Sequence, residues 1–153
     1  MEEVEQLWSD SGNTVVRWRS VMVQVRRGAL SMEGVEGIGR AAQAARAAMS
    51  GKMGALLILE TTAEVPTPDV RDRQRDVLKS LMADERLHIS SAVLGEGIAA
   101  SMRRTVVRAI ITGNPRVKVF SSVDDAVKHL AGTLGLPAAE LGVVAEKVRA
   151  GSR

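Results

Sequence analysis

Cysteine and tyrosine are absent from this 153-residue chain, and its only aromatic residues are Trp8, Trp18 and Phe120. Without cysteine the chain has no disulfide, no thiolate nucleophile and no Cys-ligated zinc or iron–sulfur centre. The scarcity of aromatic rings predicts an aliphatic core. It also removes the stacking platforms that proteins use to bind single-stranded nucleic acid.

Long apolar runs are also missing. The longest, residues 55–59, is far shorter than the roughly 20 residues that span a bilayer. The chain opens Met1-Glu2-Glu3 instead of with a basic segment and an apolar block, so we expect a soluble cytoplasmic protein without a membrane span. Lys and Arg number 21 against 18 acidic residues and are spread along the chain, which does not favour a nucleic-acid partner.

Short β-rich runs open the chain. Residues 14–19 and 21–26 read as strands, but the break at Ser20 lacks Gly, Pro or Asn, so a tight hairpin and one long bent strand both stay open. Residues 4–8 form either an extra strand or a helical turn. Residues 53–59 are continuously apolar, which is typical of a central strand covered on both faces.

Helical patterns alternate with these strands. Ser31 is a good N-cap, Thr67 precedes a proline at the first helical position, and Ser122 or Asp124 caps a later helix. Further strands are expected at residues 87–94 and 117–120, with helices near residues 98–112 and 136–148. The alternation predicts an α/β fold with a mixed, mainly parallel sheet of about four to five strands and helices packed on it. We divide the chain into an N-terminal segment (1–13), the α/β domain (14–134) and a C-terminal amphipathic helix and tail (135–153).

No stretch of the sequence carries a convincing set of catalytic groups, so we expect a protein that is not an enzyme. Residues 95–100 match the loose G-x-G-x-x-A dinucleotide pattern, but Glu96 would place a carboxylate in an anion site, and the next strand ends without a ribose-binding acid. His88 and His129 lack metal-ligand spacing. We therefore expect neither a cofactor nor a metal.

Two groups of residues are candidates for binding. Arginines on two expected helices could form a surface that binds an anion or a partner protein. The alternative is a solvated face with local ion pairs, because Asp72 and Asp76 alternate with the arginines of the first of these helices. The loop at residues 60–67 follows the central strand, where ligand-facing groups gather in open α/β sheets. Its hydroxyls are candidate phosphorylation or partner-binding positions, and the alternative is a capped connection with exposed threonines. The candidates are Arg71, Arg75, Arg103, Arg104 and Arg108 for the surface, and Thr61, Thr62 and Thr67 for the loop.

The order of elements from about residue 14 to residue 134 resembles the STAS fold, also called SpoIIAA-like and grouped with SEC14-type modules. The resemblance is carried by residues 14–26, the helix from Ser31, the strands at 53–59 and 90–95, and above all the junction at 119–127. It implies a non-enzymatic module that binds another protein, often under control of a Ser or Thr phosphorylated after the central strand. The family's Asp-Ser-Ser/Thr-Gly sequence is missing there.

Our leading hypothesis from the sequence is a protein-interaction module that binds and regulates or inhibits a partner protein of unknown identity. A toxin-neutralising immunity protein and a STAS-type signalling regulator are two examples. The alternative is a small-ligand (nucleotide or lipid) binding protein or enzyme that uses the loops at 60–67 and 95–97. A third hypothesis is a homo-oligomer formed through the helix at residues 136–148.

Overall fold

The computed structural model describes residues 4–111 and 113–151, which form six strands and five helices. The strands make one mixed sheet in chain order, with two antiparallel pairings followed by three parallel ones. The expected α/β class is confirmed, and the strand count is one higher than expected because residues near the N-terminus add an edge strand. The strands are β1 (Glu5–Ser9), β2 (Asn13–Trp18), β3 (Val21–Arg26), β4 (Met53–Leu59), β5 (Leu87–Val93) and β6 (Val117–Phe120).

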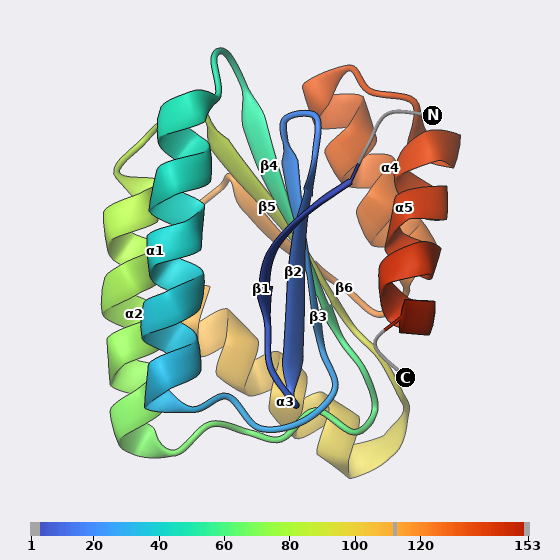
Figure 1. Ribbon diagram of the computed structural model, residues 1–153. Coiled ribbons are helices and arrows are strands. Elements are labelled where there is room, and N and C mark those ends of the chain that lie inside the picture. Colours follow the sequence, from blue (N-terminus) through green and yellow to red (C-terminus); the bar gives the residue numbers. More distant parts are fainter. Residues whose placement is uncertain (1–3, 112, 152–153) are drawn as a thin grey trace.

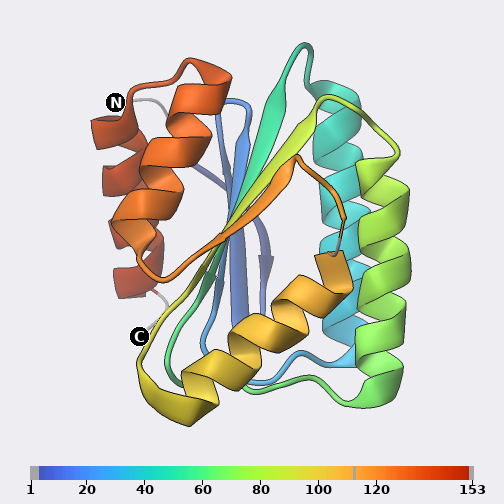
Figure 2. The same ribbon diagram turned by 180° about the vertical axis from the view of Figure 1, so that it is seen from behind.

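The helices form a layer on each face of the sheet (Figure 1). Three helices connect successive parallel strands, and because such crossovers are right-handed and the strands follow in order, all three lie on one face. The other two follow β6 and cover the opposite face. Figure 2 shows α3 crossing one end of the sheet. The helices are α1 (Met32–Ala48), α2 (Pro68–Met82), α3 (Gly97–Ile111), α4 (Val123–Leu134) and α5 (Ala138–Gly151).

A two-residue turn joins β2 to β3, so residues 14–26 form a hairpin and not one bent strand. Trp18 pairs with Val21, and Arg19 in the turn has a φ of 52° although it is not a glycine. The Arg19 guanidinium lies 4.7 Å from the centroid of the Trp18 ring and forms an ion pair of 3.1 Å with Glu140 of α5. These contacts compensate for a backbone conformation that costs a side-chain-bearing residue free energy.

The two faces of the sheet differ in chemistry. On β3 the side chains alternate, so that Val21, Val23 and Val25 pack against α4 and α5 in a continuous aliphatic core. Met22 faces α1 and α2, and the same alternation places Gln24 and Arg26 on that face. The central strand β4 is covered on both faces, as its apolar run predicts.

Helix caps and the C-terminal helix complete the fold. The Ser31 Oγ accepts a hydrogen bond of 3.0 Å from the Gly34 N–H, and of the two candidate caps for α4 it is Ser122 that accepts, from the Asp125 N–H at 3.1 Å. The apolar stripe of α5, which includes Leu141, is buried in the core of its own chain. Self-association stays a prediction, but this stripe is not available for it.

Candidate ligand-binding site

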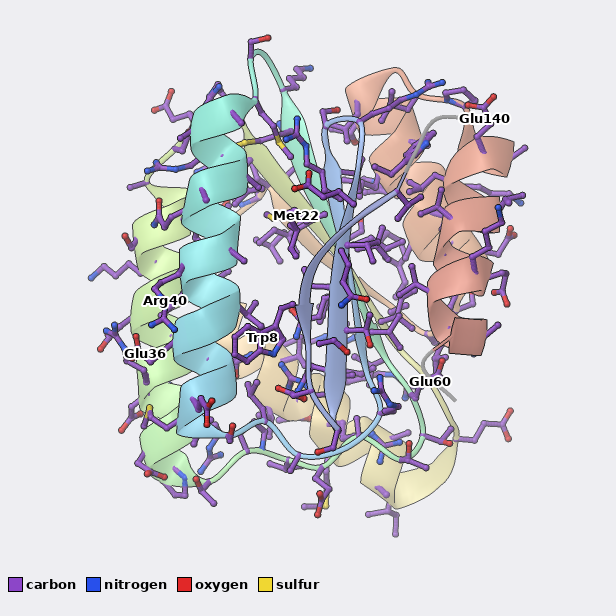
Figure 3. The ribbon with its side chains drawn as sticks, viewed as in Figure 1. Trp8, Met22, Glu36, Arg40, Glu60 and Glu140 are labelled. Atoms are coloured by element: carbon purple, nitrogen blue, oxygen red, sulfur yellow. The ribbon has the colours of Figure 1, made fainter. Side chains whose placement is uncertain are left out.

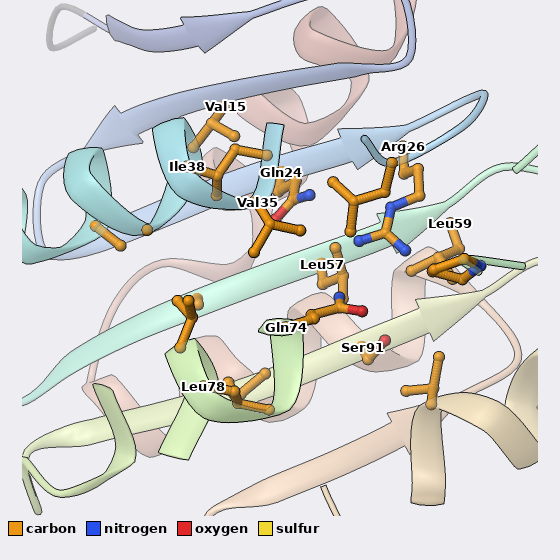
Figure 4. A pocket seen from close by; sticks show the side chains of 18 of the residues that line it. Val15, Gln24, Arg26, Val35, Ile38, Leu57, Leu59, Gln74, Leu78 and Ser91 are labelled. Carbon is orange, nitrogen blue, oxygen red and sulfur yellow. The ribbon is translucent and has the colours of Figure 1, made fainter. Parts of the chain in front are cut away.

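A cavity of about 150 Å³ lies between the sheet and helices α1, α2 and α3 (Figure 4). Its walls are mostly aliphatic and include the small residues Ala42 of α1 and Ala55 of β4. The exposed Glu64 and Val65 of the loop between β4 and α2 also line it, so the cavity opens beside this loop. Figure 3 shows Met22 on the sheet facing α1, whereas Glu36 and Arg40 lie on the outer side of that helix.

Arg26, the last residue of β3, places its side chain in this cavity and is only 3% exposed. Its Nε donates to the Asn13 Oδ1 at 3.4 Å, which is long for a hydrogen bond. Its two terminal nitrogens make no hydrogen bond or ion pair to any residue in the described part of the chain. The guanidinium is therefore a buried cation that lacks a close counter-charge.

Burial lowers the pKa of Arg26 from its ordinary value to about 10, and the negative charge of Asp10 only partly opposes this effect. That difference corresponds to about 3 kcal/mol by which burial disfavours the charged form. At neutral pH the guanidinium nevertheless keeps its proton. The folded chain thus maintains a positive charge at an energetic cost, inside an otherwise apolar space.

The carboxylate of Asp10 is engaged elsewhere. It accepts hydrogen bonds of 2.8 Å each from the Trp8 Nε1, the Gly12 N–H and the Asn13 N–H. Burial by itself would raise the pKa of Asp10, but these hydrogen bonds outweigh burial and lower it. Asp10 therefore stabilises the turn before β2 as an anion, and it reaches Arg26 only through space, beyond ion-pair distance.

Arg116 shows how this chain satisfies a structural guanidinium. Its Nη1 donates to the carbonyl oxygens of Asp84 at 2.8 Å and Leu87 at 3.0 Å, and its Nη2 donates to that of Met82 at 2.8 Å. Both terminal nitrogens thus bind the backbone that connects α2 to β5. Arg26 has no comparable set of acceptors, so its role is not explained by the packing of the fold.

Three more polar groups in the cavity wall lack a hydrogen-bond partner among the described residues. They are the Gln74 Oε1, the Ser91 Oγ and the Arg103 Nε. Figure 4 shows Arg26, Gln74 and Ser91 facing the same space from β3, α2 and β5. Buried polar atoms are usually paired, so these three groups and Arg26 make one side of the cavity polar and leave it with unused hydrogen-bonding capacity.

The two loops that the sequence singled out do meet. The Leu94 N–H donates to the Leu59 carbonyl at 3.0 Å, and a Cβ on Gly95 would lie 3.2 Å from the methyl group of Thr61. Thr61 and Thr62 are exposed. Thr67 is also exposed, and its hydroxyl donates to the Asp69 carboxylate instead of capping α2.

The five candidate arginines do not form one exposed patch. The Arg103 Nη2 donates to the Leu94 carbonyl at 3.2 Å, and the Arg104 Nη2 donates to that of Gly95 at 2.8 Å, so both side chains turn back onto the end of β5. Arg75 pairs with Asp72 at 3.3 Å. Arg71 is half-buried and Arg108 is exposed.

Sequence reasoning missed Arg26. The signal was the alternation of β3, which places Gln24 and Arg26 on the same face as Met22 while the valines occupy the other. A buried cation at the end of such a strand is recognisable only once the helices covering that face are known.

In the described part of the chain, no group of three His, Asp or Glu side chains could hold a metal ion. None of the helices described there is long and apolar enough to cross a membrane.

Comparisons with known proteins do not assign this chain to a family. No family model matches the sequence, and no curated protein matches it. Among solved structures, the chain is similar to the beta subunit of geranyl-CoA carboxylase from P. aeruginosa, with a TM-score of 0.47 and 14% identity. The alignment covers 97% of this chain but only 32% of that subunit.

Proposed function

We propose that this chain is a binding protein that holds a small, mostly apolar molecule between its sheet and helices α1–α3. The observation that carries the proposal is the cavity of about 150 Å³, whose aliphatic walls open beside the loop at residues 64–66. Protein interiors are usually packed without voids of this size, and an unfilled cavity costs stability. A ligand in this space would recover that loss. This proposal corresponds to the small-ligand alternative drawn from the sequence.

Uncharged probes test the proposal without assuming a polar end. Benzene and 1-hexanol are added to the purified protein, and the melting temperature and ligand-observed NMR are recorded. A ligand at 100 times its Kd stabilises a protein by about 2.7 kcal/mol, which is readily measured. We expect both probes to bind. The proposal fails if neither probe raises the melting temperature nor shows transfer of magnetisation from the protein.

A cavity-filling variant provides the matched control. Ala42→Leu extends a side chain into the space from α1, whereas Ala139→Leu makes the same change on an exposed position of α5. We expect Ala42→Leu to remove probe binding and Ala139→Leu to leave it unchanged. Equal binding by both variants would show that the probes lie elsewhere.

A second candidate function, binding of a partner protein, is favoured by the surface of α3. Ile98 and Met102 lie one turn apart on this helix and are 81% and 60% exposed. The apolar pair suits a partner with an apolar groove that accepts a helix. The partner's own activity would show whether this chain regulates or inhibits it. A phosphate on Thr61 or Thr62 would lie after β4, at the end of the sheet where α3 begins, and could alter binding there.

The test of this second function compares two exposed apolar positions. Ile98→Glu removes the pair on α3, and Val143→Glu makes the same change on α5, where Val143 is 46% exposed. We expect a stoichiometric partner of the native chain to be lost by Ile98→Glu and kept by Val143→Glu. Loss by both variants, or by neither, contradicts a role for α3.

A further inference from the structure

We propose that the molecule bound in the cavity carries a single carboxylate, held by the terminal nitrogens of Arg26, on an apolar body of about five to six carbon atoms. This inference rests on the proposed function and adds the class of ligand. It starts from the one feature of the cavity that an uncharged ligand leaves unexplained. That feature is the guanidinium of Arg26, 3% exposed and without an ion-pair partner among the described residues.

The geometry of the guanidinium favours a carboxylate. A guanidinium presents two parallel N–H donors that match the two oxygens of a carboxylate. In Arg26, neither terminal nitrogen makes a hydrogen bond to a described residue. Water in the cavity could accept these hydrogen bonds but would not neutralise the charge. An anion does both, and a buried charge is costly unless it is paired.

The charge balance favours a single negative charge. Arg103 and Glu64 also line the cavity, and their opposite charges cancel, so the charged side chains of the lining leave one net positive charge. A phosphate monoester carries about −1.5 to −2 charges at pH 7, which is more than Arg26 neutralises. A carboxylate matches it. The Ser91 hydroxyl, 1% exposed and without a partner, is a further donor on the same wall.

The volume sets the size of the apolar body. An engineered cavity of about 150 Å³ in another protein binds benzene, and the cavity here has about the same volume, 150 Å³. Hexanoate and benzoate are therefore the appropriate probes. Longer chains would extend past the exposed Val65 at the opening.

The experiment compares probes that differ only in their polar end. The Kd values of [1-¹³C]hexanoate, 1-hexanol and hexyl phosphate are measured by calorimetry and NMR at pH 7 for the native chain and two variants. Arg26→Met removes the proposed anion-binding group, and Arg40→Met makes the same change on the outer side of α1. Removing one partner of a buried charge pair should weaken hexanoate binding by about 30-fold or more. We expect Arg26→Met to leave the Kd of 1-hexanol unchanged. We expect Arg40→Met to leave the Kd values of both hexanoate and 1-hexanol unchanged.

A direct readout in the native chain keeps the inference testable even if Arg26→Met does not fold. The ¹³C shift of bound hexanoate reports the ionisation of its carboxyl group. We expect that group to stay ionised to a lower pH than in free hexanoate, because it lies beside a cation. A carboxyl group whose pKa in the bound state equals or exceeds that of free hexanoic acid would overturn the inference.

The outcomes separate this inference from the proposed function. If 1-hexanol binds as tightly as hexanoate, the cavity binds ligands but Arg26 does not select a carboxylate. If hexyl phosphate binds more tightly than hexanoate, the inferred single charge is wrong. If none of the three probes binds, the inference and the proposed function both fail.

Discussion

The ring of Trp8 lies directly against Gly37 of α1, so closely that a Cβ on residue 37 would be 2.1 Å from the ring atom Cζ3. Figure 3 shows Trp8 between β1 and this helix. The Trp8 Nε1 also donates to Asp10, at 2.8 Å, in the turn before β2. One side chain thus joins the edge strand, the first helix and the turn that precedes β2.

This contact predicts opposite effects for two helical glycines. Gly37→Ala forces the Trp8 ring to move, and we expect it to lower the free energy of unfolding by about 1–3 kcal/mol. Gly142→Ala on α5 meets nothing within 4 Å and should raise that free energy by up to about 1 kcal/mol. Urea denaturation followed by circular dichroism measures both. A neutral Gly37→Ala would show that Trp8 moves without cost.

The buried cation predicts a gain in stability when it is removed. Without ligand, Arg26→Met replaces an unpaired guanidinium by an apolar side chain of similar length, and we expect the free energy of unfolding to rise by about 1–4 kcal/mol. Arg116→Met is the control, because it deprives three backbone carbonyls of their donor. We expect that variant to lose about 2 kcal/mol or more. A loss in both variants would mean that Arg26 is structural.

The same cation predicts a difference in pH dependence. Burial lowers the pKa of Arg26 to about 10 in the folded chain, below its ordinary value, so at pH values between the two the unfolded chain binds more protons. The native chain therefore gains stability relative to Arg26→Met as the pH rises through about 10. Denaturation of both proteins at pH 8 and pH 11 measures this. If the difference in the free energy of unfolding between the two proteins is the same at pH 8 and pH 11, this prediction is wrong.

Asp84 predicts a stabilising contribution that is lost in acid. Hydrogen bonds from the side chain and the backbone N–H of Arg86 lower the pKa of Asp84 from 3.8 to about 2. Because the folded pKa is lower, this stability is present above about pH 4 and is lost as the pH falls through 2. We expect Asp84→Asn to be less stable than the native chain at pH 7 and to approach it at pH 2. Asp72→Asn, on an exposed position, serves as the comparison.

The helix caps predict unequal effects of two hydroxyl deletions. Ser122→Ala removes the bond to the Asp125 N–H, and we expect a loss of about 1 kcal/mol in the free energy of unfolding. Thr67→Ala should cost less, because its hydroxyl donates to Asp69 and caps no backbone N–H. Thermal denaturation of the two variants side by side measures this difference. Equal losses would contradict it.

Much of the fold follows from local patterns. The apolar run at residues 53–59 became the central strand β4, Ser31 and Ser122 cap their helices, and the α/β alternation produced a mainly parallel sheet. These features depend on periodicity and capping, which neighbouring residues determine. The sequence does not decide between a hairpin and a bent strand at Arg19, because the turn has none of the usual turn residues. In the fold, Arg19 contacts Trp18 and Glu140, and these contacts favour the hairpin.

The sequence by itself determined the fold class, the absence of cysteine chemistry and the alternation that puts Gln24 and Arg26 on one face of β3. Only the tertiary structure decided that this face borders a cavity, and that Arg26 is buried there while Asp10 is engaged in a turn. The physical reason is that the cost of a charge depends on its surroundings. Those surroundings come from helices α1, α2 and α3, which are distant in the chain and meet only when it folds.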